Sequence, residues 1–204
     1  MTLLYPTYFP NISSYIVMAH AEKLVFEVQD SYQKQTYRNR CYIYGANGKL
    51  GLHIPVKYSQ KNRQNTSEIL IDNSSNWQSI HWKSLESAYK TSPYFEYYQD
   101  DLVSLFTTKK ESLLGFNLEC IEIINSCLNL SIKYSKSLEF NKEKQQKEYR
   151  YLVNARKESE IKINPYIQVF QEKHGFINNL SILDLLFNEG PNAKSYIQIQ
   201  ALTF

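Results

Sequence analysis

The first thirty residues alternate between extended and helical patterns, and this alternation limits the folds open to the chain. Residues 3–9 read as a short strand that runs into a loop closed by two prolines, residues 13–21 as a helix, and residues 24–28 as a compact apolar strand. A strand, a helix and a second strand in so short a span predict a βαβ unit with parallel strands. We therefore expect an α/β fold with a partly parallel central sheet and flanking helices.

A β-hairpin is predicted as an addition to this sheet. Residues 40–44 and 49–56 flank the turn sequence Gly45-Ala46-Asn47-Gly48. Asn-Gly readily adopts the positive φ angles that a tight turn needs. The second arm carries an apolar residue at every second position from 50 to 56. These apolar residues share one face of the strand, and we expect that face to be buried.

Helical patterns follow from residue 77. Pro93 interrupts the first of them, and Phe95 begins a second apolar face with helical spacing. Residues 108–111, Thr-Lys-Lys-Glu, match a capping box and predict the start of a third helix. Residues 131–134 read as a further inner strand.

The C-terminal part of the chain predicts one more strand and one more helix. Residues 167–170 read as the strand. Ser181 and Asp184 are placed to accept hydrogen bonds from the first-turn amides of the helix, and Gly190 with Pro191 is placed to end it.

Length and composition indicate one globular domain over residues 1–204. The chain is 43% hydrophobic and 21% charged, which is ordinary for such a domain. Residues 139–163 are highly charged and poor in apolar residues, and they read either as a solvated connection or as a mobile lid. No run approaches the roughly 20 apolar residues of a membrane span, and the N-terminus lacks the pattern of a signal peptide. We expect no membrane span and a cytoplasmic location.

Charge and motif content argue against several classes of function. The net charge is +3 and the isoelectric point is about 8.6, which is too mild for a nucleic-acid binding protein. The three cysteines and four histidines are scattered without the spacing of a zinc site. Glycine-rich phosphate loops, dinucleotide fingerprints and nucleophile elbows do not occur. The sequence predicts no metal and leaves the cofactor open.

The densest polar cluster, residues 32–40, follows the second predicted strand. Ligands of open α/β sheets bind outside the carboxyl ends of the strands. Arg38 and Arg40 project on the same side of an extended chain, where their guanidinium groups can hold a phosphate or carboxylate together with Lys34. Tyr37 and Asn39 project on the other side of this chain. The alternative is a solvated loop that contains one structural arginine.

A second candidate region is aromatic. Trp77 and Tyr94 offer ring faces that suit a sugar or a nucleobase, and Tyr8 lies in the proline-bounded loop after the first strand. His81, close to Trp77, can act as an acid or a base near neutral pH. Packing between helices is the commoner use of such rings, and a hydrogen-bonded helix histidine is the alternative for His81.

A third candidate group lies near the start of the last helix. Four residues converge there in the predicted arrangement: Gln168, His174, Asn179 and Asp184. One interpretation is an acid/base pair of His174 with Asp184. The alternative is that Asp184 serves only as a helix cap.

Taken together, these sequence motifs resemble those of the WbqC-like protein family over nearly the whole chain. The matching stretches are Tyr8-Phe9-Pro10, Tyr32-Gln33-Lys34 with Tyr37-Arg38-Asn39-Arg40, Trp77 with Ala88-Tyr89, Ser92-Pro93-Tyr94-Phe95, and residues 165–191. The ending resembles the branch of the family that is common in Bacteroidetes. Two departures are Tyr5-Pro6, where many members have Gln-Pro, and residues 135–163, where many members carry a longer segment with a Ser-Ser pair.

The resemblance implies a role linked to cell-surface polysaccharide. The family is named from a gene in O-antigen clusters, with a suggested link to amino-acyl or acyl decoration of amino sugars, and it has no established catalytic residues to carry over. The motif positions imply the following site residues: Tyr8, Lys34, Asn39, Arg40, Gln168, His174 and Asp184.

Two functions fit these observations. The first is a transferase or ligase that acts on an activated sugar, nucleotide or acyl donor, with an anionic, sugar- or nucleotide-like ligand and with His174 or His81 moving a proton. The second is a non-catalytic binding or assembly protein of the cell-envelope pathway, acting as a homodimer or with a partner enzyme. Polar residues concentrated at predicted strand ends favour the first.

Overall fold

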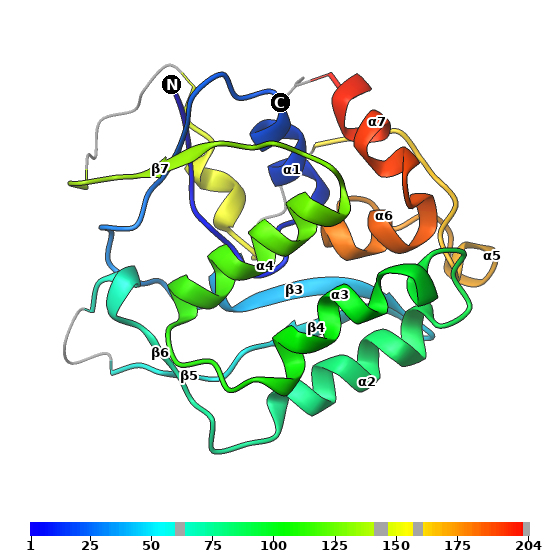
Figure 1. Cartoon of the computed structure of the whole chain (residues 1–204), viewed down its shortest axis with the longest axis horizontal. Helices are drawn as coiled ribbons and strands as arrows, with labels where there is room; N and C mark the ends of the chain where they lie inside the picture. Colours follow the sequence, from blue (N-terminus) through cyan, green and yellow to red (C-terminus); the bar gives the residue numbers. More distant parts are fainter. Residues whose placement is uncertain (60–63, 141–146, 157–160, 202–204) are drawn as a thin grey trace.

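The central sheet is built from the predicted βαβ unit. The computed structural model describes residues 1–59, 64–140, 147–156 and 161–201. β1 (Thr2–Leu4) and β2 (Leu24–Phe26) are joined by α1 (Ile12–Ala19) and pair in parallel. β7 (Tyr134–Lys136) pairs in parallel with the other edge of β2. The order of this sheet is β1-β2-β7. The prediction of a mixed α/β fold with a parallel sheet is therefore confirmed (Figure 1).

Burial and capping explain why these segments take this form. Every residue of β1 and β2 is buried, as expected for parallel strands that are covered on both faces. The side chain of Asn11 caps α1 by accepting a hydrogen bond from the Ser14 amide at 3.0 Å. α1 then packs against two C-terminal helices, α6 (Ile182–Glu189) and α7 (Asn192–Ile199).

The predicted hairpin forms from β3 (Arg40–Gly45) and β4 (Gly48–His53). Gly48 carries the positive φ angle, 97°, whereas Asn47 has a negative one. Leu52 is 3% exposed, but Leu50 beside the turn is 40% exposed. The apolar face of the second arm is therefore buried only away from the turn. The short antiparallel pair β5 (Val56–Lys57) and β6 (Leu70–Ile71) follows.

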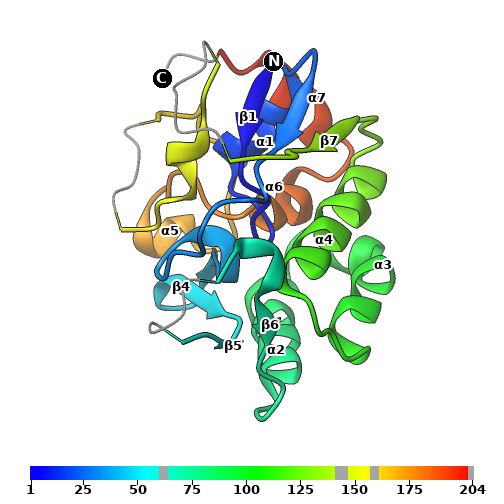
Figure 2. The ribbon, with the colours of Figure 1, turned by 90° about the vertical axis from the view of Figure 1, so that its left-hand side faces the viewer.

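Three helices pack beside the hairpin. α2 (Trp77–Tyr89) contacts β3, and α3 (Phe95–Thr107) packs between α2 and α4 (Leu113–Cys127). Figure 2 shows the parallel sheet at one end of the molecule and α2 with the short strands at the other. Short 3-10 turns complete the described elements: η1 (Tyr37–Asn39), η2 (Thr66–Glu68) and η3 (Arg150–Val153).

The predicted capping box at residues 108–111 is wrong. The amide of Thr108 donates to the Ser104 carbonyl, so this residue ends α3 instead of starting a helix. α4 begins at Leu113, and Ser112 is its cap, since its hydroxyl accepts from the Gly115 amide at 3.1 Å. The motif placed the helix cap at Thr108, four residues before the actual cap, Ser112, because Thr108 still belongs to the last turn of α3.

The C-terminal part departs from one strand prediction. Residues 167–170 form no strand and lead into the short helix α5 (Gln171–His174). Ile167 is 74% exposed while Gln168 is buried, the reverse of what an apolar strand requires. The hydroxyl of Ser181 accepts from the Leu183 amide at 3.3 Å at the start of α6, and Gly190, with a φ angle of 52°, ends it.

One hydrophobic core joins the sheet, the hairpin and the helices. Of the charged segment 139–163, residues 141–146 and 157–160 lie outside the described residues. The described part runs beside β1, because the Leu3 amide donates to the Lys147 carbonyl and the Tyr149 amide donates to the Leu3 carbonyl. Among the described residues, no helix has the length and apolar character needed to cross a membrane.

Candidate functional site

A pocket of about 500 Å³ lies at the carboxyl edge of the parallel sheet, and we name it the carboxyl-edge pocket. Tyr5 follows β1 directly, residues 33–36 belong to the polar loop after β2, and η3 contributes another wall. Both the volume and the position are typical of small-molecule sites in open sheets. The lining residues are Tyr5, Gln33, Lys34, Gln35, Thr36, Phe140, Glu148, Arg150, Tyr151, Val153, Asn154 and Arg156.

A buried carboxylate anchors one wall of this pocket. Glu27 follows β2 directly and is buried. It accepts a hydrogen bond from the Ser137 hydroxyl at 2.7 Å, and it lies 3.8 Å from a guanidinium nitrogen of Arg150. Arg150 also donates to Glu148. Because a buried charge is costly without a partner, these contacts fix Arg150 in the wall of the pocket.

A second ion pair lies behind Tyr5. Arg38 is fully buried, and its Nη2 atom lies 2.6 Å from Asp30 Oδ2. Its guanidinium carbon lies 4.0 Å from the centroid of the Tyr5 ring. Arg38 does not line the pocket, so the structure places it as a buried structural arginine that supports Tyr5. Burial raises the pKa of Tyr5 to about 12, which keeps this phenol protonated at neutral pH.

Two cations of the pocket have no acidic partner. The ammonium of Lys34 lies 5.1 Å from the centroid of the Tyr58 ring, and Nε of Arg156 donates to the side chain of Gln35. No carboxylate pairs with Lys34 or Arg156 in the part of the chain that the structure describes. The pocket therefore offers positive charge that an anionic ligand can neutralise.

Asn39 and Arg40 take a different place from Lys34. Residues 37–39 form the turn η1, so the extended chain that put Arg38 and Arg40 on one side is not present. Asn39 donates to the Ile54 carbonyl at 2.9 Å and joins the ends of the hairpin. Arg40 lies opposite His53 on the hairpin, and neither Asn39 nor Arg40 lines the carboxyl-edge pocket.

The aromatic candidates are mostly interior residues. Tyr8, Trp77 and His81 are all buried, and the Tyr8 hydroxyl lies 3.0 Å from Nδ1 of His81. The Trp77 and His81 rings meet edge to face at 5.2 Å. Burial lowers the pKa of His81 to about 4, which keeps its ring neutral near pH 7. Tyr94 is half-buried against Gly190. None of these four residues lines the carboxyl-edge pocket.

The third candidate group is an interior hydrogen-bond cluster, which we name the Asp184 cluster. Asp184 is fully buried. Its Oδ1 accepts from the Tyr89 hydroxyl at 2.7 Å, and its Oδ2 accepts from the Gln168 amide at 2.9 Å and from the Tyr166 hydroxyl. Burial raises the pKa of Asp184, although the three hydrogen bonds act to lower it. Asp184 thus joins α2 and α6 to the segment before α5.

His174 lies apart from this cluster in its hydrogen bonding. It is exposed, and its Nε2 donates to the Ala46 carbonyl at the hairpin turn, at 2.9 Å. No hydrogen bond joins His174 to Asp184 among the described residues. The geometry therefore offers no acid/base pair between them in this conformation.

Sequence reasoning missed several residues that line the pocket, and also Glu27 and Asp30, which do not line it but pair with Arg150 and Arg38. Glu27 and Asp30 carry the same signal as the polar loop, since they follow a strand in a sheet whose ligands bind at strand ends. Glu148, Arg150 and Arg156 fall in the charged segment, where composition alone does not separate a buried arginine from a solvated one. Nowhere among the described residues do three histidine, cysteine or acidic side chains gather in a way that could hold a metal ion.

Comparison with known proteins gives the family of the chain. The model of the WbqC-like protein family matches residues 5–162, which include every residue that lines the carboxyl-edge pocket. The chain is also similar to the uncharacterized protein Rv1507c of Mycobacterium tuberculosis, at 24% identity over 225 residues, 97% of each chain. No solved structure matches. Residues 165–191, which carry the C-terminal motif, lie outside the matched range. The chain belongs to the WbqC-like protein family.

Proposed function

We propose that the carboxyl-edge pocket binds the anionic part of an activated donor, and that the protein is a transferase or ligase for a sugar, nucleotide or acyl group. One observation carries this proposal: Lys34 and Arg156 line a pocket at the strand ends, and no carboxylate of the described residues pairs with either. Phosphate and carboxylate groups are the ligands that such cations hold. Family membership supports a donor used in the synthesis of cell-surface polysaccharide, such as O-antigen.

Rings at the mouth of the same pocket suit the neutral part of such a donor. Tyr5 follows β1, and Phe140 and Tyr151 come from the charged segment 139–163. Phe140 and Tyr151 are both partly exposed, so a sugar or a base can stack on them without displacing the core. In this proposal the segment 139–163 supplies one wall of the binding site.

Glu148 is the group in this pocket that is suited to moving a proton. One of its oxygens accepts from Arg150, while the other is buried and has no hydrogen-bond partner among the described residues. A rotation of the Glu148 side chain that exposes this oxygen to the pocket would let it accept a proton from an attacking hydroxyl or amine. We assign Glu148 this role in place of His81, whose ring is buried away from the pocket.

Ligand binding is tested by thermal unfolding of the purified protein against ATP, CTP, nucleotide sugars, acyl-CoAs and amino acids. A ligand at about 100 times its Kd adds roughly 2.7 kcal/mol of stability, which raises the Tm of a chain of this size by several degrees. Lys34→Met and Arg156→Met should each weaken binding of a phosphate-bearing hit about tenfold, since each removes one charge-assisted contact.

Lys133→Met is the matched control, because Lys133 is exposed and does not line the pocket. It should leave the shift unchanged. Glu148→Gln should keep the ligand-induced shift in Tm. Turnover can be measured once the acceptor is known, and this variant should lose it. An absence of any shift with every anionic compound, or equal shifts in the Lys34 and Lys133 variants, would reject the proposal and favour a non-catalytic assembly protein.

A further inference from the structure

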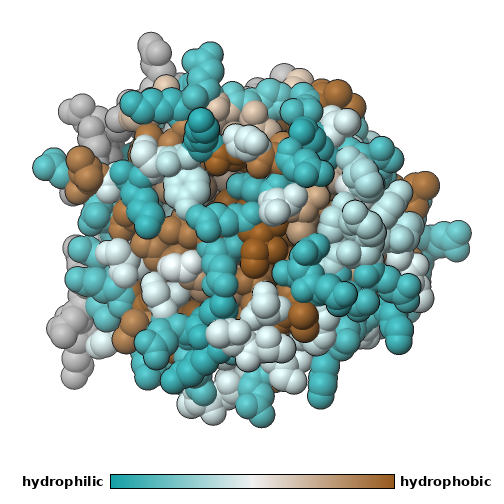
Figure 3. All heavy atoms as spheres, in the orientation of Figure 1, coloured by the Kyte–Doolittle hydropathy of each residue, from teal (hydrophilic) through white to brown (hydrophobic). Residues whose placement is uncertain are grey.

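A second pocket lies on the helical side of the molecule, and we name it the helix pocket. It has a volume of about 510 Å³ and lies between α3, the C-terminal end of α4 and the start of α7. Hydrophobic side chains gather in the middle of this face of the molecule, among polar ones (Figure 3). The lining residues are Tyr97, Tyr98, Asp101, Ile123, Ser126, Cys127, Leu128, Asn129, Pro191 and Lys194.

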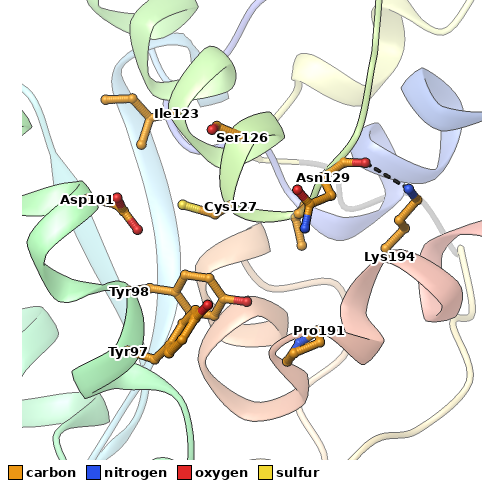
Figure 4. A pocket seen from close by; sticks show the side chains of 10 residues that line it. Tyr97, Tyr98, Asp101, Ile123, Ser126, Cys127, Asn129, Pro191 and Lys194 are labelled. Carbon is orange, nitrogen blue, oxygen red and sulfur yellow. Dashed lines mark hydrogen bonds between the residues drawn. The ribbon is translucent and has the colours of Figure 1, made fainter.

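Opposite charges face this pocket from different helices. Asp101 lies on α3 and Lys194 on α7, with Cys127 and the Tyr98 ring between them (Figure 4). The Lys194 ammonium donates to the Asn129 carbonyl at 2.8 Å, which leaves it two further protons to donate. Asp101 has no hydrogen-bond or ion-pair partner within the described ranges, and it does not pair with Lys194.

The space between these two charges is lined by groups that carry no charge. The rings of Tyr97 and Tyr98 meet edge to face with their centroids 4.7 Å apart. Tyr97 is 73% exposed, whereas Tyr98 is buried. Burial raises the pKa of the Cys127 thiol to about 11, so it stays protonated at neutral pH. Ring faces of this kind attract an ammonium group and pack against apolar parts of a ligand.

We propose that the helix pocket is a binding site for a zwitterionic small molecule that carries an ammonium and a carboxylate group. Asp101 receives the ammonium, Lys194 receives the carboxylate, and the two tyrosine rings contact the body of the ligand. An unpaired acid and an amine across one cavity satisfy both charges of a zwitterion, whereas a singly charged ligand leaves one of them unmatched. The helix pocket shares no lining residue with the carboxyl-edge pocket, so this proposal does not depend on the first.

Three probes that differ only in charge test this inference by isothermal titration calorimetry. L-Phenylalanine carries both groups, phenethylamine lacks the carboxylate, and 3-phenylpropanoate lacks the ammonium. The zwitterion should bind about tenfold more tightly than either singly charged probe, because each loses one charge-assisted hydrogen bond. Equal binding of the three probes, or binding of none of them, would overturn the inference.

Variants place the binding at this pocket. Asp101→Asn should weaken L-phenylalanine binding about tenfold and abolish the preference over 3-phenylpropanoate, and Lys194→Met should abolish the preference over phenethylamine. Asp100→Asn and Lys133→Met are matched controls, since both residues are exposed and lie outside the pocket lining. Asp101 is exposed, so its replacement should leave the fold intact. Zwitterion binding that survives both pocket variants would assign the ligand to another site.

Discussion

Asp30 and Asp184 are both buried carboxylates, but the fold surrounds them with different partners. Asp30 lies 2.6 Å from the Arg38 guanidinium and accepts a second hydrogen bond from the Thr66 hydroxyl at 2.7 Å. Asp184 accepts its hydrogen bonds from the uncharged side chains of Tyr89, Tyr166 and Gln168. One carboxylate therefore meets a full opposite charge, while the other meets only dipoles.

The two arrangements differ in what they place nearby. The Asp30–Arg38 pair lies behind Tyr5, at the carboxyl edge of the sheet, where it supports one wall of a pocket. The Asp184 cluster lies inside the protein and joins α2 to α6. The comparison shows that a buried polar residue marks a candidate ligand site only when it lies beside a pocket. Burial and hydrogen bonding alone also describe a cluster that holds the interior together.

The largest effect is expected from Asp30→Asn. This change leaves the Arg38 charge buried without its counter-charge, which costs about 3–5 kcal/mol of unfolding free energy. Urea denaturation followed by circular dichroism measures the loss. Asp100→Asn is the matched control, because Asp100 is exposed, and it should change stability by less than about 0.5 kcal/mol. A loss for Asp30→Asn that is no larger than that of its control would remove the distinction between the two carboxylates.

The next largest effect is a loss of stability at acid pH, and it comes from the buried side chain of His81. The folded-state pKa of His81 is about 4, against an ordinary value of 6.5. Because the pKa is lowered in the folded state, the neutral His81 ring favours folding fully above pH 6.5. As the pH falls from 6.5 to 4, the unfolding free energy should therefore drop by about 3 kcal/mol. His81→Gln should lose less stability than the natural protein over this interval. Urea denaturation at a series of pH values measures both, and parallel profiles would contradict the assignment.

A smaller loss is expected from Asp184→Asn. With its carbonyl in the place of Oδ2, the new amide can still accept from Tyr166 and Gln168, while its NH₂ group faces the Tyr89 hydroxyl that donates to Oδ1. The unfolding free energy should fall by about 1–3 kcal/mol, less than for Asp30→Asn. Urea denaturation at neutral pH measures the difference. A loss that exceeds the one for Asp30→Asn would reverse the comparison and show that the interior cluster carries more of the stability.

The smallest effect is the pH dependence of the Asp184→Asn loss. The folded-state pKa of Asp184 is raised. The contribution of Asp184 to the unfolding free energy is therefore fully present below its unfolded-state pKa and is lost as the pH rises through its folded-state pKa. The stability deficit of the variant should therefore be larger near pH 4 than near pH 7. The same denaturation series provides this measurement. A stability deficit that grows with pH would mean that the three hydrogen bonds lower the pKa of Asp184 by more than burial raises it.

Local sequence patterns predicted the elements better than the contacts between them. The βαβ start, the hairpin and the helices that flank Pro93 are present where their patterns indicated. The capping box at 108–111 and the strand at 167–170 were wrong because neighbouring structure outweighed the local signal: Thr108 completes a turn of α3, and the Gln168 side chain faces inward to bond Asp184.

The candidate site was predictable only in part. The polar loop after β2 does border a pocket at the sheet edge, and Lys34 lines it. Arg38 does not, because the turn η1 directs it toward Asp30. The opposite wall, with Glu148 and Arg150, comes from a segment more than a hundred residues further along the chain. No local pattern links that segment to β1, since the contact is a backbone hydrogen bond from Tyr149 to Leu3.

By itself, the sequence determined where the βαβ unit, the hairpin and the main helices lie, because those patterns depend on residues a few positions apart. The tertiary structure alone decided which polar side chains line a pocket and which are interior. That outcome depends on distant segments removing water from one arginine and leaving another accessible. Arg38 and Arg156 have the same chemistry. Arg38 is buried and paired with Asp30, whereas Arg156 is exposed and bonded to Gln35, and these two differences separate a structural ion pair from a candidate ligand contact.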